Sequence, residues 1–293
     1  MSSISSNNKT EKLSSKLARM SNSAMAFVIA YMIVVFLFSV STALMGKLFG
    51  FDSQISFSGL RFELGRHRWD KMNVAVIWSF GTLFTFLLGV IFSYLFSEFR
   101  TRVYLANLVF LWGAVISFSI VTAQAVLPLL EPGQQLACYT NLSVVYNWLS
   151  VPTVLAYMVC IIFILLLALY SIYSSKHFLA FSYSFSKVSK AGRKRKFFAE
   201  TVVIPFFLAC LIILAFTNTT YPFVNFKALN IVYMSTVALS LVFSFLVINI
   251  NDMKSEEVMR YKNLQRVNAV LFLLFIILLI FFTTAKQGFY MPI

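Results

Sequence analysis

Long apolar segments alternate with short polar ones along the whole chain. Seven runs are almost wholly apolar, and most approach or exceed the ~20 residues that a helix needs to cross a bilayer core of about 30 Å. The sequence therefore predicts an all-α polytopic membrane protein, a single domain of seven transmembrane helices. The expected spans cover residues 24–45, 73–96, 103–130, 148–173, 201–216, 231–250 and 269–282.

A polar leader, residues 1–23, precedes the first apolar run and is rich in Ser, Asn and Lys. That apolar run is longer than the core of a signal peptide, and no small-x-small motif closes it. We therefore expect a retained signal-anchor helix. The leader is expected to stay unstructured until it meets the membrane.

The composition changes the picture little but supports it. Of the 293 residues, 60% are hydrophobic and 12% are charged, against about 25% charged residues in soluble proteins. The three cysteines, Cys138, Cys160 and Cys210, form no C-x-x-C motif and no disulfide framework. They therefore indicate neither a metal site nor a redox compartment.

The basic residues are distributed unevenly between the polar segments. With seven spans, 17 of the 24 Lys and Arg residues fall on the side of the N-terminus and 7 on the other side. Cytoplasmic segments carry the excess of Lys and Arg. We therefore expect a cytoplasmic N-terminus, an outer C-terminus and a location in a cell membrane, either plasma or inner.

An unbroken basic run, Arg193, Lys194, Arg195 and Lys196, precedes the fifth span. Anionic headgroups of the inner leaflet attract each such residue by about 1 kcal/mol. The run is therefore interpreted as an orientation signal that contacts the inner leaflet, with docking of a partner as the alternative. Nucleic-acid binding is disfavoured, because no recognition fold accompanies the run.

Small residues recur along one face of several spans. Helices in lipid associate through such residues, because these allow the backbones to approach closely. We expect the second, third and sixth spans to form the inner core, although a polar pathway is the alternative interpretation. The expected packing positions are Gly81, Thr85, Gly89, Ser93, Gly113 and Ser117.

Charged residues are missing from the seven expected spans, which contain no Asp, Glu, Lys, Arg or His. Ionisable residues inside a membrane usually mark function, so their absence disfavours proton pumps, retinal proteins and intramembrane proteases. The strongest polar group is Gln124, which either lines a cavity or bonds a neighbouring helix. The candidate cavity residues are Gln124, Thr236, Ser240 and Ser244.

The segment between the first two spans is the most individual part of the chain. Residues 55–64 alternate between apolar and polar. Around a turn at Ser58-Gly59, Ile55 would lie opposite Phe62 and the apolar side chains would share one face. We predict a short amphipathic β-hairpin in this outer loop, with an interfacial helix as the alternative.

A basic and aromatic patch follows the predicted hairpin. It would capture an anionic ligand, a lipid headgroup or an acidic partner, or its side chains would simply snorkel to headgroup phosphates. A metal site from Glu63, His67 and Asp70 is disfavoured because cations flank it, so we expect no metal and no cofactor. The patch consists of Arg66, His67, Arg68, Trp69 and Lys71.

Two classes of function fit these patterns best. The favoured class is a non-catalytic anchoring, scaffold or assembly subunit of a membrane complex, with a membrane protein as partner. The alternative is a transporter or channel for a neutral or amphiphilic solute, lined by Ser, Thr and Gln. An interfacial enzyme that acts through Glu63, His67 or Asp70 of the first outer loop is a second alternative, although none of them is assigned as catalytic.

Overall fold

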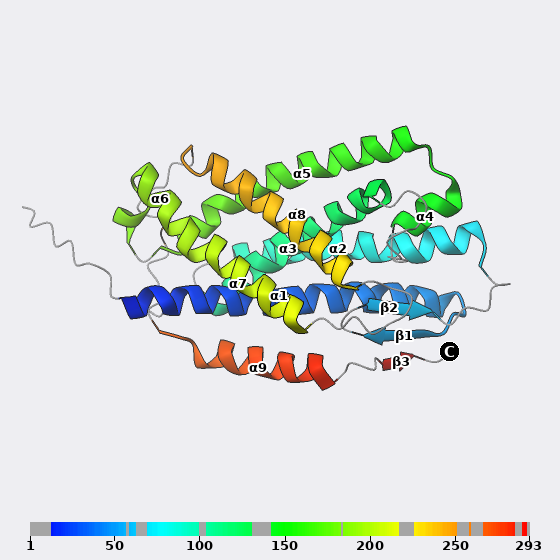
Figure 1. Cartoon of the computed structure of the whole chain (residues 1–293), viewed down its shortest axis with the longest axis horizontal. Coiled ribbons are helices and arrows are strands. Elements are labelled where there is room, and N and C mark those ends of the chain that lie inside the picture. The colour runs from blue at the N-terminus through cyan, green and yellow to red at the C-terminus, as the bar shows by residue number, and fades with distance from the viewer. Residues whose placement is uncertain are drawn as a thin grey trace, which may run out of the picture.

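The structure, a computed structural model, describes residues 13–56, 59–62, 69–99, 104–130, 142–182, 184–216, 226–250, 258, 266–284 and 289–291. Long helices lie side by side along one direction, and a small β-sheet lies beside one end of the first helix (Figure 1). Six of the described helical segments are apolar and long enough to cross a membrane. The chain is therefore a polytopic all-α membrane protein.

The long helices follow the apolar runs, and consecutive ones run in alternating directions (Figure 1). A shorter apolar helix, α9 (Ala269–Thr284), follows the last of them. The membrane-length segments are α1 (Leu13–Leu48), α2 (Lys71–Phe99), α3 (Tyr104–Leu130), α5 (Thr153–Ala180), the joined α6 to α7 (Ala191–Phe216) and α8 (Phe226–Val247).

The first helix begins well before the apolar run that predicts it. α1 starts at Leu13, inside the polar leader that we expected to be unstructured. Ser15, Ala18, Arg19 and Asn22 are buried there, so this polar stretch is amphipathic and packs against the rest of the bundle. The leader is helical from Leu13 onward because its buried side chains pack against other helices of the bundle.

The fifth expected span also begins earlier, within the basic run. The helix α6 (Ala191–Phe198) continues through a π-helical turn, η3 (Ala199–Val203), into α7 (Ile204–Phe216). Pro205 therefore lies in the middle of a continuous helical segment. A proline lacks the N–H for the regular ladder and crowds the preceding turn, and the wider π turn next to it accommodates this defect.

The fourth expected span, 148–173, is divided in the structure. A separate short helix, α4 (Leu142–Leu149), ends before Ser150, whose φ of 51° is left-handed. α5 then starts at Thr153, directly after Pro152. Proline at the boundary suits a helix start, because its missing N–H has no partner there in any case.

The predicted hairpin is present, but in another register. β1 (Ser53–Ser56) and β2 (Gly59–Phe62) are antiparallel. The expected pairing of Ile55 with Phe62 is wrong, because Ile55 lies opposite Leu60 and Ser53 opposite Phe62. The shift is by two residues, so the apolar side chains still share the buried face. The two connecting residues lie outside the described part.

A third strand, which the sequence pattern did not predict, completes the sheet. β3 (Phe289–Met291) pairs antiparallel with β1, so the order is β2-β1-β3.

At the other end of the bundle, the amide of Asn22 in α1 donates to the Arg266 carbonyl at 2.9 Å and accepts from the Asn268 N–H at 3.0 Å. α9 therefore starts beside one end of α1 and leads toward the sheet at the other.

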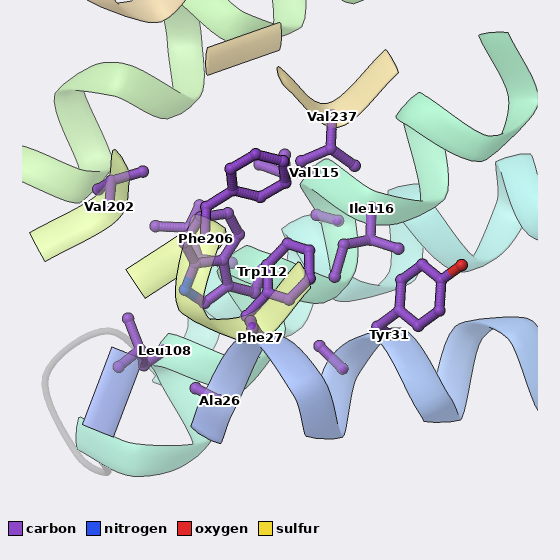
Figure 2. Close-up of a cluster of buried hydrophobic side chains, with 14 of the residues drawn as sticks. Ala26, Phe27, Tyr31, Leu108, Trp112, Val115, Ile116, Val202, Phe206 and Val237 are labelled. Carbon is purple, nitrogen blue, oxygen red and sulfur yellow. The ribbon is translucent and has the colours of Figure 1, made fainter. Parts of the chain in front are cut away.

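The core is centred on α1 and α3, which are the most deeply buried of the long helices. We expected α2, α3 and α8 to form the inner core, but α1 is buried more deeply than α2 or α8. Figure 2 shows aromatic and branched side chains from α1, α3, α7 and α8 meeting in one cluster. The Phe27 ring meets Trp112 edge to face at 4.9 Å and Phe206 at 5.5 Å.

Candidate functional site

The glycines expected at helix contacts lie where helices meet closely. A Cβ atom added at any of three glycines would come to 3.0 Å or less from a side-chain atom of a facing helix. Gly81 faces α1, whereas the other two lie between α2 and α3. The facing pairs are Gly81 with Thr42, Gly89 with Phe118 and Gly113 with Phe92.

Of the hydroxyl residues of the same set, Thr85 and Ser93 bond to carbonyls of their own helix, and Ser93 also bonds to a neighbouring helix. Thr85 donates to the Gly81 carbonyl at 2.9 Å. Ser93 donates to the Gly89 carbonyl at 2.9 Å and also lies 3.1 Å from the Tyr170 hydroxyl of α5. Ser117 is fully buried in α3.

The three candidate cavity residues of α8 are all buried. The Ser240 hydroxyl lies 2.7 Å from that of Ser171 in α5, and Ser244 donates to the Ser171 carbonyl at 2.9 Å. Thr236 donates to the Tyr233 carbonyl of its own helix at 2.8 Å. These hydroxyls therefore bond to the α5 and α8 backbones and side chains.

Gln124 is fully buried in α3 and bonds to α8. Its amide nitrogen donates to the Tyr233 hydroxyl at 2.6 Å. A second bond between neighbouring helices lies close by, where the Tyr31 hydroxyl of α1 donates to the Asn230 side-chain oxygen at 2.7 Å. These buried polar contacts join α1, α3 and α8, and no sequence pattern pointed to Tyr31 or Asn230.

The basic and aromatic patch of the first loop is only partly described. Arg66, His67 and Arg68 lie outside the described residues, as does Glu63 of the disfavoured metal site. Trp69 stacks on Phe51 at 4.0 Å, within an apolar cluster under the sheet. Its ring is thus part of the packing between the hairpin and α2.

Lys71, the last residue of that patch, and its neighbour Asp70 lie at the start of α2. Lys71 is exposed. The Asp70 carboxylate accepts the Asn73 N–H at 2.6 Å, as a residue preceding a helix commonly does. Among the described residues, no three His, Cys, Asp or Glu side chains gather closely enough to hold a metal ion.

The four basic residues of α6 differ in exposure. Arg193, Arg195 and Lys196 are exposed, whereas Lys194 is buried. α6 presents its cations on one side and buries Phe197 and its neighbour on the other. The run of four basic residues therefore lies in an amphipathic helix, with three of its cations exposed.

A partly buried ion cluster next to α6 was not anticipated from the sequence. The Glu200 carboxylate in η3 accepts from Arg19 at 3.1 Å and from Lys16 at 3.3 Å, both in α1. The Arg19 guanidinium also lies 5.0 Å from the centre of the Phe197 ring. One signal was available, because Glu200 is the only acidic residue between Glu131 and Asp252.

Comparisons of this chain with protein-family models, with curated proteins and with solved structures find no match.

Proposed function

We propose that the protein crosses its membrane seven times, with a cytoplasmic N-terminus and an outer C-terminus. The position of α9 supports the seventh crossing, because it leads from the Asn22 end of α1 to β3 beside β1. Its 16 residues span about 24 Å, somewhat less than a bilayer core of about 30 Å. The excess of basic residues on one side supports the direction. A plasma or inner membrane is the proposed location.

Single-cysteine labelling tests the direction. A chain without Cys138, Cys160 and Cys210 receives one cysteine in place of Lys71 or of Lys190, which are exposed. On intact cells, a membrane-impermeant maleimide should label Lys71→Cys, and Lys190→Cys only after the cells are opened. The reverse pattern would overturn the threading and leave the fold untouched.

We infer that the protein is a non-catalytic anchoring or assembly subunit of a membrane complex. One observation carries this proposal. Polar side chains deep in the bundle, such as Gln124, Ser240 and Ser244, bond to other helices of the same chain. In the described helices the charged residues and His lie toward the ends. The middle of this part of the bundle thus supports packing better than acid–base chemistry or ion transfer.

The outer face of α5 is the proposed contact surface for the protein partner. α5 is the least buried of the membrane-length helices. Its exposed side chains are almost all apolar, with Leu155, Ile162 and Leu169 about half to two-thirds exposed. Because only 22% of the apolar window of α5 is buried, most of that surface is available for another helix.

Photo-crosslinking in native membranes tests this assignment. A benzoyl-phenylalanine at Leu165 of α5 should give one protein adduct of constant mass, and the chain should migrate on native gels well above its own 33.4 kDa. Leu273 of α9, similarly exposed, and Leu111 of α3, buried, are the matched positions. Lipid adducts alone at Leu165, with a chain that migrates by itself, would contradict the subunit proposal.

A second candidate function, transport of a neutral or amphiphilic solute, is favoured by one observation. The side-chain oxygen of Gln124 is buried and accepts no hydrogen bond from the described residues. A solute hydroxyl or amide could donate to it. If the protein transports such a solute, the wild type should give solute flux in liposomes and Gln124→Leu should abolish it. If Gln124 is purely structural, the wild type itself should give no flux.

A further inference from the structure

The exposed side of α6, together with the residue that precedes it, carries a group of cations at one end of the bundle. We name Lys190, Arg193, Arg195 and Lys196 the α6 basic patch, and all four are exposed. Arg193 and Lys196 are three residues apart, so they are neighbours on the helix surface. Arg195 lies toward the end of α8, where its guanidinium is 5.5 Å from the centre of the Phe245 ring.

The helix that carries this patch is firmly held from its other side. Phe197 is buried beneath the Arg19 guanidinium. Phe198 is fully buried and meets the Phe178 ring edge to face at 6.1 Å. The patch is therefore presented by a fixed surface, so a ligand there does not have to order the helix first.

Among the described residues, the hydrogen-bond partners of Arg193 and Arg195 carry no negative charge. Arg193 donates to the backbone carbonyl of Ser186 at 3.0 Å. Arg195 donates to the side-chain oxygen of Asn249 at 2.8 and 3.0 Å, in the amide orientation that satisfies both groups. These oxygens orient the guanidinium groups, and no acidic side chain of the described residues pairs with either of them.

The acidic side chain that follows α6 in the chain is already paired with cations of another helix. Glu200 pairs with Lys16 and Arg19 of α1. The ion pairs found among the described residues do not include any member of the α6 basic patch. The patch therefore has a net positive charge that a negatively charged molecule can neutralise.

The patch also lies at the depth of lipid headgroups. α6 runs through η3 into α7 as one segment, Ala191–Phe216, that is apolar beyond its first turns. At 1.5 Å per residue, Lys196 is only about 12 Å along the helix from Ile204, where α7 begins. Long basic side chains at such a position extend to the phosphates of the adjacent leaflet.

We propose that the α6 basic patch is a saturable binding site for the headgroup of an anionic phospholipid. The headgroup phosphate is received by Arg193 and Lys196, with Arg195 beside them at the end of α8. Three of the properties described above fit a lipid: the exposed cations, the adjacent apolar surface of α7, and the fixed position of α6. The site depends on the membrane location of the fold, but not on the direction of threading or on a protein partner.

The test compares two double variants in nanodiscs of phosphatidylcholine with and without phosphatidylglycerol. R193Q/K196Q removes two cations from the patch, and K47Q/K71Q removes two exposed cations from the other end of the bundle. Native mass spectrometry counts retained phosphatidylglycerol, and thermal unfolding measures the stabilisation that this lipid adds. R193K/K196R keeps the charge and tests whether the effect is electrostatic.

We expect phosphatidylglycerol to raise the melting temperature of the wild type, of K47Q/K71Q and of R193K/K196R alike. In R193Q/K196Q the rise and the retained lipid should both fall by about half or more, since two of the four cations are lost. Equal losses in both glutamine variants would show diffuse attraction by net charge and overturn the site. Equal protection by inorganic phosphate in detergent would overturn the assignment to a lipid.

Discussion

Gly81 shows how a single missing side chain sets the distance between two helices. An added Cβ atom would collide with Thr42 Oγ1 and lie 3.0 Å from the Phe38 ring. Thr42 cannot rotate away freely, because its hydroxyl donates to the Phe38 carbonyl at 3.1 Å. The two helices would have to separate, and in lipid such close contact supplies much of the association energy.

We predict that Gly81→Ala lowers stability by about 1–3 kcal/mol, the usual cost of overpacking. Gly192→Ala is the matched control, because an added Cβ there meets nothing within 4 Å, and alanine favours helix. The melting temperature measured in detergent should therefore fall only for Gly81→Ala. Thr42→Ala in the same chain should restore part of the loss, and no restoration would contradict the proposed clash.

At the scale of elements, the ion cluster connects α1 with the π turn of the fifth span. Arg19 is 2% exposed and Glu200 supplies a carboxylate to it from η3. A buried cation that loses its counter-charge is costly, whereas an exposed pair contributes little. The cluster thus fixes the position of α6 and η3 on the early turns of α1.

We predict that Glu200→Gln lowers stability by up to about 3 kcal/mol, because it leaves the buried Arg19 charge without this carboxylate. Lys16→Gln should cost much less, since the Lys16 side chain is 28% exposed to solvent. The double variant R19Q/E200Q should cost less than the sum of its single variants in thermal unfolding. Additive losses would show that the two residues do not interact.

The sequence predicted elements well where the signal was local, and poorly where it was not. Uniform apolar runs located the membrane-length helices, and alternation located the hairpin. The start of α1 at Leu13 depends on burial of Arg19 and Asn22 against distant segments, which local hydropathy does not contain. For the candidate site, the bond of Gln124 to a neighbouring helix was among the expected alternatives, whereas the Glu200 cluster depends on residues far apart in the chain.

At the scale of the whole molecule, two distant contacts hold α9 along α1. Asn22 holds the start of α9 through Asn268, and β3 joins β1 at the far end. Between them, α9 packs mainly on α1 and leaves side chains such as Leu273 exposed. The placement of this last helix therefore depends strongly on its ends.

We predict that Pro-Gly-Pro in place of Phe289–Met291 opens the sheet, because proline donates no ladder hydrogen bond. Hydrogen exchange of β1 amides should rise about tenfold or more, the equivalent of losing one or two bonds of about 1 kcal/mol each. Val-Val-Val at the same positions should keep β1 protected, since strand pairing uses the backbone. Unchanged exchange of the β1 amides in the Pro-Gly-Pro chain would show that β3 does not pair with β1.

The pairing of β3 with β1 has a consequence for biosynthesis. β1 leaves the ribosome long before β3, so one edge of the hairpin waits unpaired while most of the chain is still being made. β3 reaches that edge only from the hairpin side of the bundle, after α9 has passed along α1 from the Asn22 end. A chain whose last helix does not pack along α1 would therefore keep one edge of β1 unpaired, and an unpaired strand edge is a template for pairing with another chain.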